Sequence, residues 1–414
     1  MAFEGSKLDY VAQVDSQSLK DEAKLSISED GLAVTTLFNP LFIDFADIVS
    51  FEKQGYCAVV VTGTDRLTFS SLGNLLDAFC LELQTAFNAR VRKALFISGD
   101  PCFEAEGEFE YAEPQSAAGA QTAAGAQQTA AGAAGAQQAT ARGQARIEVY
   151  DDCVCLLPPD NRARRIPFAF MTGLQKGNFE LTLTLNGGEQ YSFIRLGANT
   201  DAFEASIRAR LHAWREDALD AVHKLDGSLS QTQLAALATL MPQGVAVSAG
   251  QMAAIAPSYL AAVEAQIAAS RAADTYAAFK EICAPDEICI GMKTNLAGEQ
   301  EENILWFIAP SKTKPTAAVE FAVDEDTAAA TFVYNTGSDR ADFIRRLNRV
   351  MEAIDFHREV ISLPDDQLAS AENASYRMAV KRNAALRSIR ESLAGRVIHS
   401  SPDAWTTTVR SYLC

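Results

Sequence analysis

The sequence predicts an α+β protein in which sets of antiparallel strands are each followed by one packed helix. Three observations predict it: a pattern recurs after 123 residues, apolar residues alternate along several short segments, and the apolar period becomes helical after each hairpin. Alternation is typical of half-buried strands, and the longer period is typical of a helix with one apolar face. Each repeat is therefore expected to be a small sheet closed by one amphipathic helix.

Two pairs of segments define the repeat. Residues 43–46 (Ile-Asp-Phe-Ala) resemble residues 166–169 (Ile-Pro-Phe-Ala), and residues 72–79 resemble residues 196–203, since both begin Leu-Gly and end Asp-Ala-Phe. The first pair is 123 positions apart and the second pair 124. Because two matches keep the same register, they indicate an internal duplication.

Alternating apolar residues predict the strands of each copy. In the second copy, residues 179–185 alternate between apolar and polar, and Asn-Gly-Gly at 186–188 supplies the positive φ angles that a tight hairpin needs. In the first copy, the matching hairpin is expected to have strands at 57–62 and 67–69 around a turn at 63–65. Both copies are thus expected to end their sheet with a hairpin.

Helical periodicity follows each hairpin. The expected apolar stripe comprises Phe79, Leu83 and Phe87 in the first copy and Phe203, Ile207, Leu211 and Trp214 in the second. This spacing places the side chains on one face of a helix. Asn74 and Asn199 precede the stripes and are expected to cap the two helices.

This order of elements resembles the pleckstrin-homology (PH) domain, which has seven strands in two curved antiparallel sheets and a C-terminal helix. The resemblance covers roughly half the chain and depends on the architecture and the repeat, because PH domains share almost no invariant sequence. It implies tandem PH-like antiparallel β-barrel or sandwich domains, each capped by its C-terminal helix. The arrangement is also similar to the double PH-like modules of histone chaperones, an analogy of fold that does not decide function.

A low-complexity tract at 115–144 contains almost only Ala, Gly, Gln and Thr, a composition that cannot build a core. It is either a linker between two domains or an insertion within the second. The repeat favours the insertion. In the first copy a candidate strand at 8–14 precedes the strand at 24–28, and in the second a candidate at 103–111 precedes the strand at 146–150, across the tract.

The C-terminal half is expected to contain a third, smaller unit. Its hairpin and helix are expected from Val319, Phe321 and Val323, a turn at 324–326, Phe332 and Tyr334, and the stripe Phe343, Leu347, Val350 and Ile354. Earlier strands are expected at 288–292 and 305–308, too few for a seven-stranded copy. An amphipathic helix is expected at 365–393.

The sequence thus predicts five regions. They are a first PH-like domain at 1–96, a second at 97–225 with its insertion at 113–145, a helical connector at 226–285, a third, degenerate PH-like β/helix unit at 286–362, and a helical tail at 363–414.

Composition limits the classes of protein that the chain can belong to. It has 414 residues, a formal net charge of −17, 48% hydrophobic residues and 21% charged residues. This apolar fraction excludes wholesale disorder, and the acidic balance argues against a nucleic-acid coat. The start lacks the basic and apolar regions of a signal peptide, and the eight cysteines follow no disulfide spacing. We therefore expect a cytoplasmic protein with free thiols.

No pattern in the sequence indicates catalysis. Ser248 lies in a segment that superficially resembles a nucleophile elbow, but Ala246 stands where that motif requires glycine, so a helix cap is the better interpretation. The four histidines are scattered, and the close pair Cys153 and Cys155 has no second pair to complete a zinc site. The sequence therefore predicts no enzyme, no cofactor and no metal.

Two basic clusters are candidate partner-binding sites. Arg162, Arg164 and Arg165 form a basic turn that is either a solvated loop or a site for an acidic peptide or phosphate. The second cluster belongs to a segment, 376–396, in which six basic residues oppose one acid. Its candidates are Arg377, Lys381, Arg382, Arg387 and Arg390.

The tail cluster has two interpretations. The favoured one is that the basic helix docks on the acidic body of the protein. The other is contact with nucleic acid or an anionic surface. Binding of a membrane lipid headgroup is disfavoured, because Lys20 and Lys24 in the first copy lie beside Asp21 and Glu22 and make no basic funnel.

The sequence therefore predicts a non-enzymatic intracellular scaffold or adaptor that binds protein partners through sheet edges or the groove beside each C-terminal helix. One alternative is an anionic-ligand binder, for a phospholipid surface or nucleic acid, that uses the basic C-terminal helix. The other is an enzyme of an unrecognised type.

Overall fold

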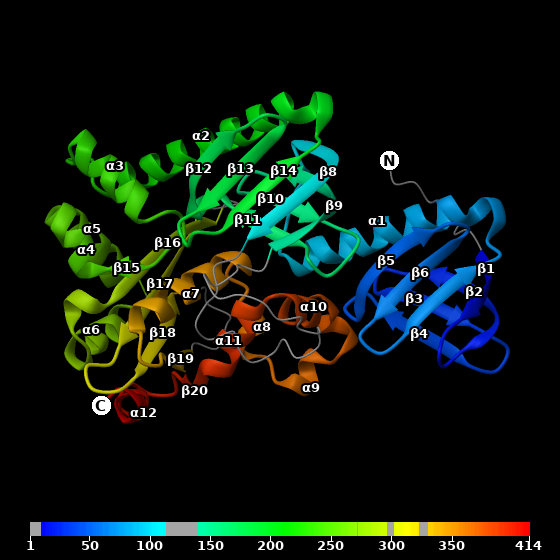
Figure 1. Cartoon of the computed structure of the whole chain (residues 1–414). Coiled ribbons are helices and arrows are strands. Elements are labelled where there is room, and N and C mark those ends of the chain that lie inside the picture. The colour runs from blue at the N-terminus through cyan, green and yellow to red at the C-terminus, as the bar shows by residue number, and fades with distance from the viewer. Residues whose placement is uncertain (1–9, 113–139, 271, 296–301, 323–329) are drawn as a thin grey trace, which may run out of the picture. The chain divides into compact units, whose positions relative to one another are not determined.

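The computed structural model of the chain describes residues 10–112, 140–270, 272–295, 302–322 and 330–414 (Figure 1). Its two compact units are Met1–Leu211 and His212–Cys414. The first unit contains two seven-stranded antiparallel sheets, and the second contains one six-stranded sheet. The fold is therefore α+β, as the sequence predicts.

The first sheet has the order β4-β3-β2-β1-β7-β6-β5. Its strands are β1 (Tyr10–Asp15), β2 (Lys20–Ile27), β3 (Gly31–Thr35), β4 (Pro40–Asp44), β5 (Ile48–Gln54), β6 (Cys57–Thr62) and β7 (Arg66–Ser70). Because β4 and β5 are the two ends of this order and do not pair, the sheet is open. Of the two forms that the sequence predicts, barrel or sandwich, the closed barrel is wrong.

The second sheet repeats this order as β11-β10-β9-β8-β14-β13-β12. Its strands are β8 (Phe103–Ala112), β9 (Thr140–Val149), β10 (Cys153–Leu157), β11 (Arg164–Pro167), β12 (Met171–Lys176), β13 (Glu180–Leu185) and β14 (Gln190–Ile194). Every strand therefore has a counterpart in the first sheet. We call the two sheets with their helices copy 1 and copy 2.

One helix follows each sheet, α1 (Leu76–Ala94) in copy 1 and α2 (Thr200–Leu225) in copy 2. Phe79 of α1 is fully buried and meets the Tyr10 ring edge-on, with ring centroids 5.2 Å apart. Phe203 of α2 is also fully buried and packs on the Phe193 ring at 5.1 Å. The predicted apolar stripes thus close the two cores.

The asparagine cap expected for α1 is not formed. Asn74 and Asn199 each lie inside a single 3₁₀ turn, Gly73–Leu75 or Gly197–Asn199, that leads into the helix. In copy 1 the residue at the start of α1 is Leu75, which makes no side-chain cap. A 3₁₀ turn satisfies the first backbone groups by shorter-range hydrogen bonds, so no asparagine side chain is needed.

The low-complexity tract connects two paired strands. Strands β8 and β9 pair from Phe103 with Val149 to Ala112 with Thr140, so residues 113–139 join neighbouring strands of one sheet. The last part of the predicted tract, 140–144, belongs to β9. The remainder lies outside the described residues, as do residues 8 and 9 of the expected first strand and the expected turn at 324–326.

The sheet of the second unit runs in simple sequence order from β15 to β20. Its strands are β15 (Val247–Ser248), β16 (Cys289–Asn295), β17 (Glu302–Pro310), β18 (Thr316–Ala322), β19 (Ala330–Asn335) and β20 (Leu393–Ile398). This order differs from that of the two seven-stranded sheets. The hairpin and helix that the sequence predicts for this unit are β18, β19 and α7 (Arg340–Ala353).

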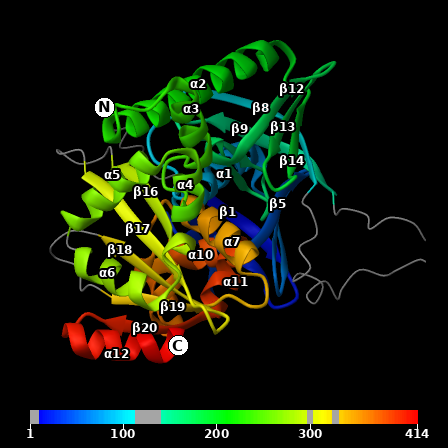
Figure 2. The ribbon, with the colours of Figure 1, turned by 90° about the vertical axis from the view of Figure 1, so that its left-hand side faces the viewer.

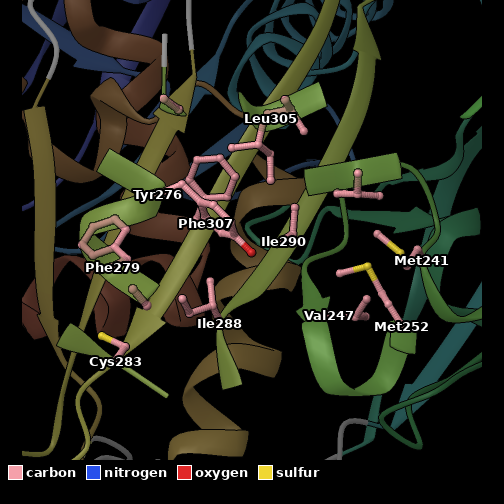
Figure 3. Packing of buried hydrophobic residues seen from close by; sticks show 14 of the residues in the cluster. Met241, Val247, Met252, Tyr276, Phe279, Cys283, Ile288, Ile290, Leu305 and Phe307 are labelled. Carbon is pink, nitrogen blue, oxygen red and sulfur yellow. The ribbon is translucent and has the colours of Figure 1, made fainter. Parts of the chain in front are cut away.

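Helices cover both faces of this third sheet (Figure 2). The remaining helices are α3 (Gln231–Leu240), α4 (Ala249–Ile255), α5 (Pro257–Ala268), α6 (Ala273–Ile282), α8 (Glu359–Ser362), α9 (Asp365–Leu368), α10 (Ala374–Arg382), α11 (Ala384–Ser392) and α12 (Pro402–Leu413). Along β17, Leu305 and Phe307 join the cluster formed with α3–α6 and α12 (Figure 3). Trp306 points to the opposite face, where it packs on Phe356 after α7. Because both faces are covered, β17 is an almost continuous apolar run.

The tail is not the single helix expected at 365–393. It contains the short helices α9, α10 and α11, and then β20, which pairs with β19 from Ile398 with Ala330 to Leu393 with Tyr334. Asn383 separates α10 from α11 in an extended conformation, and its side chain accepts a hydrogen bond from the Leu386 N–H. A side-chain cap of this kind starts a new helix instead of continuing the old one.

Candidate interaction surface

Three large apolar side chains are exposed at one end of the first sheet. Leu37 and Phe38 lie in the loop between β3 and β4 and are 88% and 83% exposed, and Phe42 on β4 is 53% exposed. We call these three residues the apolar tip. They are three of the nine exposed large apolar side chains among the described residues, yet they fall within six consecutive positions. Such clustering marks interaction sites more than isolated exposure does.

The local sequence forces the loop side chains outward. The Thr36 hydroxyl accepts a hydrogen bond from the Asn39 N–H (2.9 Å) and donates one to the Asn39 carbonyl (3.1 Å). This side-chain turn satisfies the backbone of a four-residue loop. The two residues between Thr36 and Asn39 are therefore left at its apex with no core to enter.

The tip adjoins an edge strand of the described sheet. Strand β4 is the last in its sheet, and the Phe45 N–H donates to the Asp30 carbonyl at 2.9 Å. Because hydrogen-bonded and non-hydrogen-bonded pairs alternate in an antiparallel ladder, the backbone groups of Phe42 and Asp44 point away from β3. The Asp44 carbonyl already accepts a hydrogen bond from the Asp47 N–H at 2.9 Å, so Phe42 is the residue that defines the outward edge beside the tip. An exposed edge with an apolar side chain is a template for pairing with another chain.

A loop of copy 2 pairs with the opposite edge of copy 1. The Phe51 N–H of β5 donates to the Pro159 carbonyl, and the Asn161 N–H donates to the Val49 carbonyl, both at 2.9 Å. Between them, Ser50 and Asp160 form an antiparallel bridge. The loop between β10 and β11 thus extends the first sheet by one short segment.

A small cavity of about 270 Å³ lies beside this contact. Its lining includes Phe51 and Leu83 from copy 1 and Ala145 and Pro159 from copy 2. Cys80 also lines it, and burial raises the pKa of this thiol, which keeps it protonated and poorly nucleophilic. The volume is below the range usual for ligand pockets. The cavity is better explained as incomplete packing between the copies than as an active site.

A buried carboxylate joins the two copies. Glu148 on β9 is fully buried and accepts hydrogen bonds from Arg92 of α1 (2.9 Å), from Arg146 (2.7 Å) and from the Tyr150 hydroxyl (2.8 Å). Burial, the largest single influence, would raise the pKa of Glu148, but these donors and the positive charges outweigh it and lower the pKa. The site is therefore a buried ion-pair network that connects the two copies.

The predicted basic turn is occupied by contacts within copy 2. Arg162 pairs with Asp160 at 2.6 Å and lies over the Phe109 ring, and Arg164 lies over the Tyr111 ring at 5.0 Å. The Arg165 side chain is only 4% exposed and pairs with Asp152 at 2.7 Å. The three arginines therefore do not converge on one exposed site. Their role in binding a partner remains a prediction.

The predicted tail cluster is likewise engaged within its own unit. Arg390 donates to the Val360 and Leu363 carbonyls at 2.5 and 2.9 Å, which places it at the end of α8. Arg387 donates to the Lys381 carbonyl at 2.5 Å, and Arg377 donates to the Ala369 carbonyl at 3.0 Å.

Lys381 is exposed and Arg382 half-buried at the end of α10. Most of this cluster thus stabilises the ends of neighbouring helices. That geometry does not favour an exposed basic face for nucleic acid.

A buried polar cluster in the second unit was not expected from the sequence. The His399 Nε2 lies 3.0 Å from a Glu320 carboxylate oxygen, Thr331 donates to the same oxygen, and the Trp405 Nε1–H donates to the Thr331 hydroxyl at 2.7 Å. Glu320 is 3% exposed. The His399 side chain is 25% exposed, whereas Glu320 and Thr331 are buried. Because these polar groups satisfy one another, the cluster is explained by packing of β20 and α12 on the sheet.

The remaining chemistry is limited in the part of the chain that is described. There, no group of three or more His, Cys, Asp or Glu side chains is arranged to hold a metal ion, and no helix is long and apolar enough to cross a membrane. Cys153 and Cys155 are both buried in β10. Ser248 caps α4 by accepting a hydrogen bond from the Gln251 N–H, as the favoured interpretation of the sequence predicts.

Sequence reasoning missed the apolar tip. Its signal was present: two large apolar residues stand side by side in a short loop bounded by Thr36 and by the Asn-Pro of residues 39–40. Apolar residues in a turn that cannot bury them contradict the usual pattern of strands and turns. The chain matches no protein-family model and no curated protein.

Proposed function

We propose that this chain is a non-enzymatic scaffold or adaptor, built from tandem PH-like domains, that binds a protein partner at the apolar tip and the adjoining β4 edge. The observation that carries the proposal is the exposure of Leu37 and Phe38 beside β4, the last strand in the order of the described sheet. The PH-like identity is supported by the element order of each copy, seven antiparallel strands followed by one helix.

The chemistry of the tip fits a protein partner better than the other candidates. Burial of one Leu or Phe side chain contributes about 1.5–3 kcal/mol, so the two loop residues together supply a useful anchor. A strand edge adds main-chain hydrogen bonds, which give affinity that is tolerant of partner sequence. A nucleic acid or anionic headgroup would instead require converging positive charge.

The test is a comparison of matched variants of the full chain. The immobilised wild-type protein, the double variant Leu37→Glu/Phe38→Glu and the control Leu81→Glu are exposed to the same cell extract. Leu81 on α1 is 67% exposed and is not part of the tip. We expect proteins that are retained by the wild type and the control but reduced at least about tenfold on the double variant, the loss that removal of about 1.4 kcal/mol produces.

Two results would contradict the proposal. Identical captured proteins on all three forms would show that the tip binds no partner. Turnover of a generic hydrolase or transferase substrate by the purified chain, unchanged in the double variant, would favour the enzyme alternative.

A further inference from the structure

We infer that the partner at the apolar tip is a second copy of this chain, whose β12 edge receives the tip. This inference rests on the proposed function, since it names the protein that the tip binds. It is carried by one observation. A loop of copy 2 contacts an edge strand of copy 1, and the counterparts of these two surfaces, a loop in copy 1 and an edge strand in copy 2, are both exposed.

The internal contact joins two different elements. Copy 2 contributes the loop between β10 and β11, and copy 1 contributes the β5 edge, with two hydrogen bonds of 2.9 Å through Phe51 and Asn161. Because the two surfaces differ, the contact is heterologous, or head-to-tail. In copy 1 the loop between β3 and β4 is the counterpart of the contributing loop. In copy 2 the β12 edge is the counterpart of the receiving edge.

The two receiving edges have the same backbone geometry. Strand β5 has a register shift between Ile48 and Ser50, and β12 has one at the matching place, between Met171 and Gly173. Phe51 of β5 faces Val60, and Leu174 of β12 faces Leu183, at positions 123 residues apart in both strands.

This match predicts which backbone N–H groups point away from each sheet. The Phe51 N–H points out of its sheet, where it reaches Pro159. The Leu174 N–H therefore also points out of its sheet, at an edge that has no further strand in the described part of copy 2.

The surroundings of the two edges match as well. Lys53 of β5 pairs with Asp77 of α1 at 2.5 Å, and Lys176 of β12 pairs with Asp201 of α2 at 2.6 Å. Each ion pair ties the edge strand to the helix of its own copy. The β12 edge therefore presents a second receiving surface of the same construction, and its Leu174 is half-buried where Phe51 is buried in copy 1.

The two contributing loops differ in a way that suits their contacts. Counted back from the matching residues Ile43 and Ile166, Leu37 and Phe38 occupy the positions of Asp160 and Asn161. Copy 2 is tethered to copy 1, so a short linker supplies a high effective concentration and polar residues suffice. A contact between separate chains lacks that tether and needs apolar burial. The exposed Leu37 and Phe38 provide it.

A head-to-tail contact gives a closed dimer only if the rotation that relates neighbouring chains is 180°. It generates rings or open filaments. The expected assembly is therefore a concentration-dependent series of oligomers, with one free tip and one free β12 edge at its ends.

The test uses the full chain with two blocked forms. Leu37→Glu/Phe38→Glu blocks the tip, and Leu174→Glu places a charge on the receiving edge, with Leu174→Pro as a second edge variant that removes the outward N–H. Leu81→Glu is the control. Sedimentation velocity is measured at concentrations that approach the roughly millimolar level of a tethered contact.

We expect wild type and control to form oligomers that grow with concentration, and each blocked form alone to stay monomeric. A mixture of the tip-blocked and edge-blocked forms should give dimers and nothing larger, since each form retains one working half. Circular dichroism melting of each form separates blocked association from failure to fold.

Three results would overturn the inference. They are a monomeric wild type at every concentration, growth that persists in the tip-blocked form, and a closed dimer that the edge variants leave intact. The wild type could also be monomeric while proteins captured from the extract are still lost in the tip-blocked form. That result would contradict self-association and would support the proposed function.

Discussion

Glu148 shows how one buried side chain couples stability to pH. Its carboxylate is fully buried between Arg92, Arg146 and Tyr150, and its pKa in the folded protein is below the ordinary value of 4.5. A group with a lowered folded pKa contributes stability above its unfolded pKa. That contribution is lost as the pH falls through the folded value.

We therefore expect Glu148→Gln to lower the free energy of unfolding by roughly 3 kcal/mol at pH 7, the lower end for a broken buried pair. The lower end applies because Arg92 and Arg146 keep 28% and 35% of their side chains exposed. The difference from wild type should shrink as the pH falls below about 4.5. Urea unfolding at pH 3 to 7 measures it.

The control for the Glu148 ion-pair network is Tyr150→Phe, which removes one hydrogen bond and keeps the ion pairs. It should cost roughly 1 kcal/mol and leave the pH dependence in place. A Glu148→Gln variant whose deficit stays constant down to pH 3 would contradict a lowered pKa at this site.

The cysteines provide a second test at the scale of single residues. Cys102 and Cys414 are exposed, whereas Cys153, Cys155, Cys283 and Cys289 are buried. Burial raises the pKa of Cys283 and of Cys289 from 9.0 to about 12. Because only the thiolate reacts, such a shift lowers the reactive fraction about 1,000-fold.

At pH 8 a thiol reagent should modify Cys102 and Cys414 of the native protein rapidly. The four buried thiols should react only after guanidinium is added, which mass spectrometry of the labelled peptides detects. Fast labelling of Cys283 in the native state would contradict the packing described for the second unit.

At the scale of elements, the two helices that close the sheets should be energetically equivalent. Phe79 and Phe203 are both fully buried, and their ring contacts involve different partners. Each substitution by alanine should therefore cost about 3–5 kcal/mol. Because the two cores are separate, the losses should add within roughly 0.5 kcal/mol in the double variant if unfolding is two-state.

The matched control is Leu81→Ala on α1. Its side chain is 67% exposed, so the change should stay within about 0.5 kcal/mol. Calorimetry of the three single variants and of the Phe79→Ala/Phe203→Ala double variant measures these costs. A negligible cost at either phenylalanine would mean that the two matching segments are not structural equivalents.

At the scale of the whole molecule, the pairing of β8 with β9 predicts how the chain tolerates a large deletion. Ala112 and Thr140 face each other in the register, so their backbones are already close. A turn of about four residues rich in Asn and Gly can join them. Replacing residues 113–139 in this way should leave the melting temperature unchanged or slightly raised, because closing a shorter loop costs less entropy.

Thermal unfolding followed by circular dichroism tests this replacement. A lower melting temperature would show that the replaced residues contribute contacts to the folded protein. Two transitions in place of one would indicate that the copies had been uncoupled.

The sequence by itself determined the local elements and their repetition. The alternation before Leu185 and the stripe from Phe79 to Phe87 correspond to β13 and α1, because each pattern reflects only the geometry of its own segment. The match of residues 43–46 with 166–169 likewise located equivalent strand ends, β4 and β11, and the order of the two sheets repeats accordingly.

Only the tertiary structure decided where polar and apolar groups of distant segments meet. Arg387 and Arg390 were candidates for an external partner, but folding brings carbonyl groups at the ends of α10 and α8 within their reach. Phe38 is apolar like the core residues, yet the turn at Thr36 leaves it exposed. The contact of Arg390 with α8 joins residues 30 positions apart, which no local period encodes. The turn at Thr36 is local and its signal is present in the sequence, but only the order of the sheet places it beside the edge strand β4.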